Sequence, residues 1–108
     1  MARRTRVQMF CNQYIDGAPF LTETLELSMS GALVRRVLSP NLDRACYALE
    51  LGLVDQPEDR VWLCASPVWR MGAFEAMRFV AQTPADRLRL AHLLGQVSRP
   101  RFGDFADN

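Results

Sequence analysis

The stretch Leu25-Glu26-Leu27-Ser28-Met29-Ser30-Gly31-Ala32-Leu33 decides the fold, because apolar and polar residues alternate around a short serine–glycine corner. A period of two predicts strands, with Leu25, Leu27 and Met29 on one face and Thr24, Glu26 and Ser28 on the other. Gly31 allows a backbone bend that a side chain would obstruct. A carboxylate, a hydroxyl and free backbone amides are therefore expected to meet at a corner able to bind a small polar ligand. An ordinary hairpin has the same pattern, so the rest of the chain must distinguish the two.

The chain on either side of this corner also reads as strands. The Asp16-Gly17 pair predicts a hairpin turn, and Pro67, which has no N–H, predicts a bulge or an edge position. The short connections favour antiparallel pairing, because parallel strands need long crossovers. The predicted strands are Val7–Ile15, Phe20–Ser28, Gly31–Leu38, Ala45–Leu53, Arg60–Arg70 and Phe74–Ala81.

One helix is predicted near the end of the chain. Thr83-Pro84-Ala85-Asp86 is a typical helix start, with a capping threonine, a proline at the first helical position and an early acidic residue. An apolar stripe follows, expected to cover an open mouth or edge of the sheet: Leu90, Leu93, Leu94 and Val97. The predicted fold class is all-β, a six-stranded antiparallel β-barrel with one C-terminal α-helix. Residues 1–97 are expected to form this single domain and residues 98–108 a flexible tail.

Composition narrows the classes of function. The 108 residues are 49% hydrophobic and 23% charged, which suits a packed core, and the net charge of +1 argues against nucleic-acid binding by charge alone. Cys11, Cys46 and Cys64 lie in apolar runs and are expected to be buried; with His92 as the single histidine, the spacing argues against a zinc site. No signal peptide or membrane-spanning run is recognised, so the expected location is the cytoplasm, without membrane insertion.

Several motifs occur in an order that resembles the PilZ domain family. The leading segment is Arg3-Arg4-Thr5-Arg6-Val7, where that family has Arg-x-x-x-Arg, and the corner Glu26–Gly31 matches Asp/Asn-x-Ser-x-x-Gly except that Glu26 replaces Asp or Asn. No two of the three arginines have the family's four-residue offset. Later parts of the chain also resemble family strand ends and its closing helix: Val68-Trp69-Arg70, Ala76-Met77-Arg78-Phe79 and Thr83–Leu94.

The resemblance implies a receptor for cyclic di-GMP, a bacterial second messenger, that acts without catalysis or a cofactor and relays the signal to an unidentified protein partner. Arginine forks pair with phosphate or with guanine O6 and N7, Glu26 would accept from guanine N–H groups, and Trp69 would stack on a base. Of Arg35 and Arg36, at most one is expected to face the ligand, because adjacent strand residues point to opposite faces. The candidate ligand-binding residues are Arg3, Arg4, Arg6, Glu26, Ser28, Gly31 and Trp69.

Two other interpretations remain open, and an enzyme is not expected. The departures from both motifs are compatible with a degenerate PilZ-like domain that acts as a protein–protein adaptor without nucleotide binding. A small β-barrel that binds single-stranded nucleic acid would use the arginines and exposed aromatic residues, although the low net charge counts against it. An enzyme is disfavoured, because His92 has no neighbouring serine or cysteine motif and no phosphate-cradling glycine loop is present.

Overall fold

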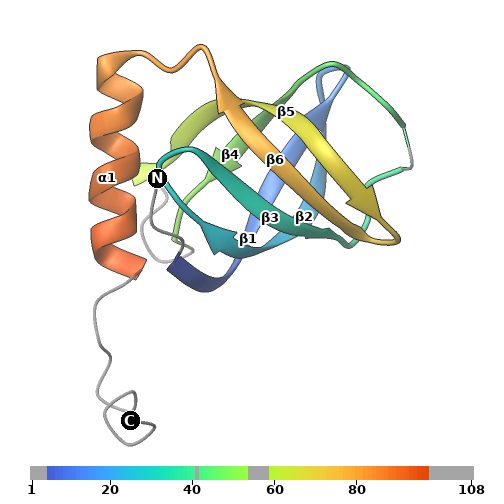
Figure 1. The fold of residues 1–108 in the computed structure, drawn as a ribbon, viewed down its shortest axis with the longest axis horizontal. Coiled ribbons are helices and arrows are strands. Elements are labelled where there is room, and N and C mark those ends of the chain that lie inside the picture. Colours follow the sequence, from blue (N-terminus) through green and yellow to red (C-terminus); the bar gives the residue numbers. More distant parts are fainter. Residues whose placement is uncertain (1–4, 41, 54–58, 98–108) are drawn as a thin grey trace, which may run out of the picture.

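The computed structural model describes residues 5–40, 42–53 and 59–97. Six antiparallel strands close into a barrel in the order β1-β2-β3-β6-β5-β4, and one helix follows them (Figure 1). This confirms the predicted architecture, while Arg3, Arg4 and the predicted tail lie outside the described residues. The elements are β1 (Thr5–Ile15), β2 (Ala18–Leu27), β3 (Gly31–Arg36), β4 (Tyr47–Leu51), β5 (Val61–Met71), β6 (Phe74–Val80) and α1 (Pro84–Val97).

The first hairpin forms as its turn residues predict. Asp16 and Gly17 have φ values of 53° and 85°, the left-handed backbone that a two-residue hairpin turn requires. The Asp16 carboxylate also accepts hydrogen bonds from the Arg44 guanidinium, at 2.9 Å from Nε and 2.7 Å from Nη2. These bonds lower the pKa of Asp16 and tie the hairpin to the segment before β4.

The alternation predicted for β2 is interrupted by a bulge. Thr24 pairs with Val34 and Glu26 with Leu33, so Leu25 has no partner on β3. The extra residue shifts the alternation by one position. Thr24 and Leu27 are therefore both buried in the barrel, whereas Leu25 is only half-buried. The prediction that Leu25 and Leu27 share one face, and Thr24 and Glu26 the other, was wrong for this reason.

The cysteines have different surroundings. Cys11 is buried in the barrel, where its Sγ lies 2.7 Å from Thr22 Oγ1 and accepts a hydrogen bond from Thr24 Oγ1 at 3.3 Å. Burial raises the pKa of its thiol. Cys64 is partly buried. The prediction that Cys46 is buried was wrong, because this residue lies just before β4 and Tyr47, the next residue, takes the inward position.

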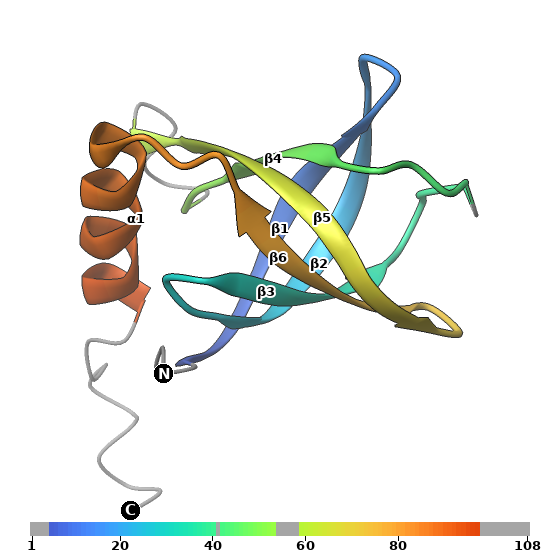
Figure 2. The same cartoon turned by 45° about the horizontal axis from the view of Figure 1, so that its top comes forward.

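Helix α1 closes one end of the barrel (Figure 2). Its first turn is capped reciprocally: Thr83 Oγ1 accepts from the Asp86 N–H, and Asp86 Oδ2 accepts from the Thr83 N–H, both at 3.1 Å. Leu90 and Leu93 are buried in the core, and Leu94 and Val97 pack against it, as the predicted stripe requires. Within the described part of the chain, no helix has the length and apolar character needed to cross a membrane.

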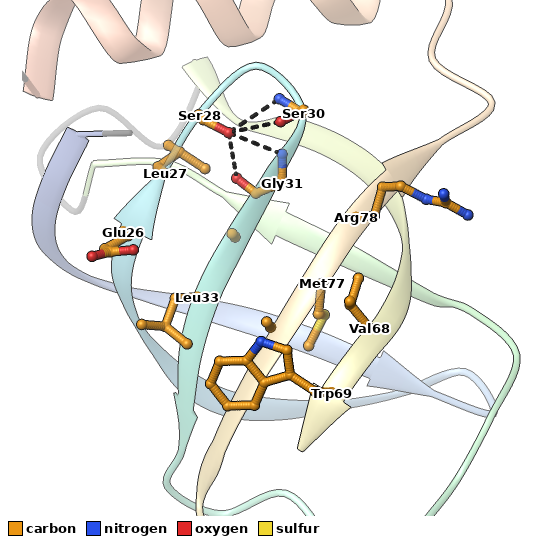
Figure 3. Close-up of a pocket in the computed structure, with 12 residues that line it drawn as sticks. Glu26, Leu27, Ser28, Ser30, Gly31, Leu33, Val68, Trp69, Met77 and Arg78 are labelled. Carbon is orange, nitrogen blue, oxygen red and sulfur yellow. Dashed lines mark hydrogen bonds between the residues drawn. The ribbon is translucent and has the colours of Figure 1, made fainter. Parts of the chain in front are cut away.

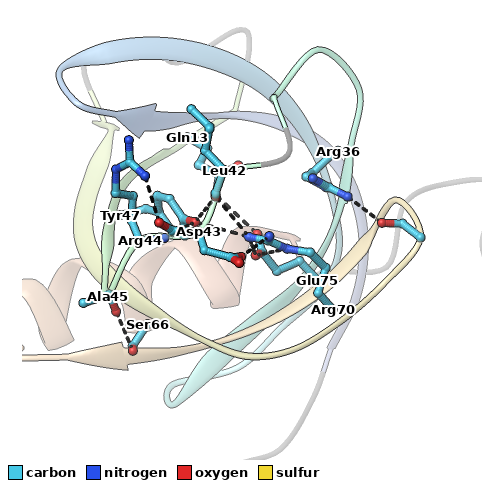
Figure 4. A network of polar contacts seen from close by, with 11 residues as sticks. Gln13, Arg36, Leu42, Asp43, Arg44, Ala45, Tyr47, Ser66, Arg70 and Glu75 are labelled. Atoms are coloured by element: carbon cyan, nitrogen blue, oxygen red, sulfur yellow. Dashed lines mark hydrogen bonds and ion pairs between the residues drawn. The ribbon is translucent and has the colours of Figure 1, made fainter.

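A polar network fixes the inward side of β5 (Figure 4). Glu75 is fully buried and accepts a hydrogen bond from Arg70 Nε at 2.9 Å. Arg70 also pairs with Asp43 and donates to the Tyr47 hydroxyl at 3.2 Å, while that hydroxyl donates to the Leu42 carbonyl at 2.6 Å. Because this arginine points inward, the residues on either side of it in the strand point outward.

Candidate ligand-binding site

The corner between β2 and β3 is organised by the Ser28 side chain. Its hydroxyl oxygen accepts hydrogen bonds from the N–H groups of Ser30 and Gly31, both at 3.2 Å, and donates to the Gly31 carbonyl at 3.3 Å (Figure 3). The Ser28 N–H donates to the same carbonyl at 2.9 Å. Two of the backbone amides expected to be free are thus bound within the corner, so that prediction was wrong. Ser28 shapes the corner from a buried position.

Gly31 is required by the close approach of β6. It pairs with Arg78, and a Cβ atom added to Gly31 would lie 2.2 Å from the Met77 carbonyl oxygen. No side chain fits at that distance from a neighbouring backbone. The expectation that a side chain would be obstructive here is confirmed, and the cause lies in strand pairing.

A row of outward-facing residues crosses five strands of the barrel. In pairing order it runs Arg6, Glu26, Leu33, Ala76 and Trp69, from β1 through β2, β3 and β6 to β5. Neighbouring strands lie about 4.8 Å apart, so the four gaps span about 19 Å along the sheet. The row thus carries a cation, a carboxylate, a small apolar floor and an aromatic ring, with Glu26 and Trp69 on either side of Leu33 (Figure 3).

A depression of about 270 Å³ lies at the end of this row that is formed by β5. Four predicted site residues line it, namely Glu26, Ser28, Gly31 and Trp69. The floor and walls are completed by other residues of β2, β3, β5 and β6 and by Ser30 of the corner: Leu27, Ser30, Ala32, Leu33, Val68, Ala76, Met77 and Arg78. Pockets for drug-sized molecules measure about 300–1,000 Å³, so this depression suits a small ligand or one part of a larger one.

The bulge predicted at Pro67 shapes one wall of this depression. Pro67 pairs with Met77 and Trp69 with Ala76, which leaves Val68 without a partner and 63% exposed. Trp69 is thereby aligned with the outer row and remains 48% exposed. A half-exposed indole at a strand end is suited to stacking on a planar ligand.

Arg78 is a site residue that the sequence interpretation did not include. It is exposed, lies two residues after Ala76 on β6 and lines the same depression. The signal was present, because residues two apart in a strand share a face. Figure 3 shows its side chain directed away from the barrel.

A second depression, of about 560 Å³, lies at the other end of the row, which is formed by β1. Arg6 lines this depression and not the first, so the structure separates Arg6 from Trp69 although they share one row. Glu26 and Leu33 line both depressions and form the boundary between them. The remaining lining residues are Val7, Glu23, Leu25 and Arg35.

The two adjacent arginines of β3 separate as expected. Arg35 is exposed on the outer face and lines the second depression. Arg36 donates from Nη2 to the Gly72 carbonyl at 2.5 Å, at the tip of the β5–β6 hairpin. One arginine therefore faces the candidate site and the other supports the fold.

The charges at the site suit a polar ligand with both donors and anionic groups. Arg6, Arg35 and Arg78 surround the two depressions, together with Glu23 and Glu26. Among the residues that the structure describes, no group of three or more histidine, cysteine, aspartate or glutamate side chains could hold a metal ion. The chemistry available here is stacking, hydrogen bonding and ion pairing.

The fold is similar to those of solved structures. One is the PilZ domain of CeSA from a cellulose-synthesizing bacterium, with a TM-score of 0.68 and 15% sequence identity over 87% of this chain and 97% of that one. Another is an uncharacterized Legionella protein, with a TM-score of 0.63 and 17% identity over 98% of this chain and 99% of that one. Neither the comparison with protein-family models nor that with curated proteins found a match. The structural likeness shows a PilZ-like fold, as the order of the motifs predicted.

Proposed function

We propose that the outer face of this PilZ-like barrel binds cyclic di-GMP, and that the domain acts in the cytoplasm as a receptor that relays ligand binding to a protein partner, without catalysis. The observation that carries the proposal is the row of outward-facing residues that ends in Arg6 on one side and Trp69 on the other. The fold shared with a PilZ domain supports the same ligand class.

The geometry supports a placement for one guanine. The base would stack on the exposed indole of Trp69, above the apolar floor formed by Leu33 and Ala76. Guanine N1–H and N2–H₂ are donors, and the Glu26 carboxylate at the edge of the depression is an acceptor for them. Arg78 is close enough to the depression to pair with a phosphodiester.

Arg6 supplies the second cation. It lies beside Glu26 in the strand pairing, at the end of the leading segment that contains Arg3 and Arg4. Capture of a doubly charged ligand would bring this segment over the sheet and change the surface offered to a partner. The relay in this proposal depends on that change.

One observation favours the adaptor without nucleotide binding. Ser28 and Gly31, the two motif residues that match the family, are both accounted for by the corner and by strand pairing. A barrel that no longer binds a ligand would still need Ser28 and Gly31 to fold. The residues that discriminate between receptor and adaptor are therefore the outward-facing Arg6, Glu26 and Trp69.

Isothermal titration calorimetry with cyclic di-GMP tests the proposal. The wild-type protein is expected to bind at tens of micromolar or below, and Arg6→Gln to weaken binding, with an effect that shrinks as salt is raised. Arg89→Gln is the matched control, because Arg89 is an exposed arginine of α1 outside both depressions. Folded wild-type protein that gives no heat at tens of micromolar ligand would reject the receptor and support the adaptor.

A further inference from the structure

The second depression contains an arginine whose side chain is held in a defined orientation. Arg35 donates from Nε at 2.9 Å and from Nη2 at 2.6 Å, both to Glu23 Oε1. Glu23 is buried, whereas the Arg35 side chain is 46% exposed. A buried carboxylate thus fixes one edge of an exposed guanidinium on the outer face of the barrel.

The pairing with Glu23 leaves the other edge of the guanidinium for a ligand. A guanidinium has five N–H donors, and the side-on contact uses one on Nε and one on Nη2. Among the described residues, Arg35 Nη1 has no hydrogen-bond partner. The Nη1–Nη2 edge is therefore a second fork, and its plane is set in advance by the carboxylate.

Two strand irregularities create the depression that this fork borders. Leu25 is the bulged residue of β2, and on β1 the register moves from Arg6 opposite Glu26 to Met9 opposite Thr24. A hollow of about 560 Å³ lies over this distorted part of β2, with Arg6 of β1 and Arg35 of β3 on either side of it. Leu25 contributes an apolar surface to it.

The positions of the two depressions suit a ligand with two bases. Arg35 lies two residues from Leu33 along β3, and Trp69 lies two strands away from Leu33. With about 3.4 Å per residue and about 4.8 Å per strand, the Cα atoms of Arg35 and Trp69 are about 12 Å apart. Trp69 lines the first depression and Arg35 the second, so two bases joined by a ribose–phosphate ring can each contact one anchor.

We infer that Arg35 reads the second guanine of the dinucleotide, in the depression between β1 and β3. This inference rests on the proposed function. An arginine fork pairs with the adjacent O6 and N7 acceptors of guanine, whereas adenine presents a donor amine beside N7. Arg35 is thus a specificity-determining residue, and Glu23 is the residue that positions it.

The experiment compares cyclic di-GMP with 3′,3′-cyclic GMP-AMP, in which one guanine is replaced by adenine. Both are titrated by calorimetry into the wild-type protein, Arg35→Gln, Arg35→Lys and the control Arg89→Gln. The lysine variant keeps a cation beside the buried Glu23 but lacks the fork, so it separates base reading from loss of folding. Thermal melting of each variant reports whether it is folded.

The wild-type protein and the control are expected to prefer cyclic di-GMP by about 5- to 150-fold, the range for one bidentate base contact. In both Arg35 variants the preference should fall to about twofold, the statistical advantage of two equivalent guanines. Affinity for the mixed dinucleotide should stay the same in Arg35→Lys, which keeps the positive charge. Binding of cyclic di-GMP with a preference that Arg35 variants leave unchanged overturns this inference alone. Binding of neither dinucleotide overturns the proposed function, and this inference with it.

Discussion

Gly31→Ala should destabilise the domain whether or not a ligand is present. The added Cβ would lie 2.2 Å from the Met77 carbonyl oxygen and 3.4 Å from the Arg78 Cα, and both atoms belong to backbone. Overpacking of this kind costs about 1–3 kcal/mol. Separating β3 from β6 would also weaken the hydrogen bond from the Phe79 N–H to the Ser30 carbonyl, worth about 0.5–1.5 kcal/mol. The expected loss is therefore about 1.5–4.5 kcal/mol.

Thermal melting followed by circular dichroism measures this loss. A domain of this size changes its melting temperature by about 4–8 °C per kcal/mol, so Gly31→Ala should melt at least about 6 °C below the wild type. Gly95→Ala is the matched control, because Gly95 lies in α1 with no atom within 4 Å of an added Cβ. That change should stabilise the helix by about 0.5–1 kcal/mol. Equal melting temperatures for Gly31→Ala and the wild type would refute the packing argument.

Three further predictions concern the corner, the helix and the thiols. Ser28→Ala should cost about 1–3 kcal/mol in urea denaturation, because two corner amides lose their acceptor; an unchanged midpoint would contradict this. Leu90→Ala should lower the free energy of unfolding by about 2–5 kcal/mol in the same assay, because Leu90 is buried. Leu88→Ala, at a residue that is 74% exposed, should lower it by less than about 0.5 kcal/mol. Similar losses in the two variants would argue against the predicted stripe. Iodoacetamide at pH 8 should label the exposed Cys46 first and Cys11 only after unfolding, because burial raises the pKa of the Cys11 thiol. Mass spectrometry that shows equal labelling rates for Cys46 and Cys11 in the folded protein would reject this prediction.

The parts of the fold that the sequence predicts correctly are set by short-range rules. Asp16-Gly17 adopts the left-handed backbone that its residue types favour. Thr83 and Asp86 cap the first turn of α1, as their positions in the sequence predict. Pro67 produces its bulge because a missing N–H disturbs the ladder wherever the partner strand comes from. Such features need no knowledge of which strands become neighbours.

The features that the sequence did not reveal depend on strand register or on the detailed geometry of the corner. Leu25 faces outward because the pairing of β2 with β3 skips it, and nothing in its alternating pattern marks the skipped position. Ser28 binds the corner amides instead of offering its hydroxyl outward, which follows from the turn geometry. Arg35 becomes a candidate ligand contact only because the buried Glu23 lies opposite it.

The receptor proposal is tested most directly by the two tryptophans of β5. Trp69 and Trp62 are 48% and 47% exposed, but only Trp69 lines the candidate depression, while Trp62 packs on Tyr14 with ring centroids 5.1 Å apart. In calorimetric titrations with cyclic di-GMP, Trp62→Ala should bind as the wild type does, and its fluorescence should show quenching of Trp69. Trp69→Ala should bind about 5- to 150-fold more weakly, the loss of one stacking contact of about 1–3 kcal/mol. Wild-type affinity in Trp69→Ala, or a loss confined to Trp62→Ala, would contradict the placement of the ligand on this face.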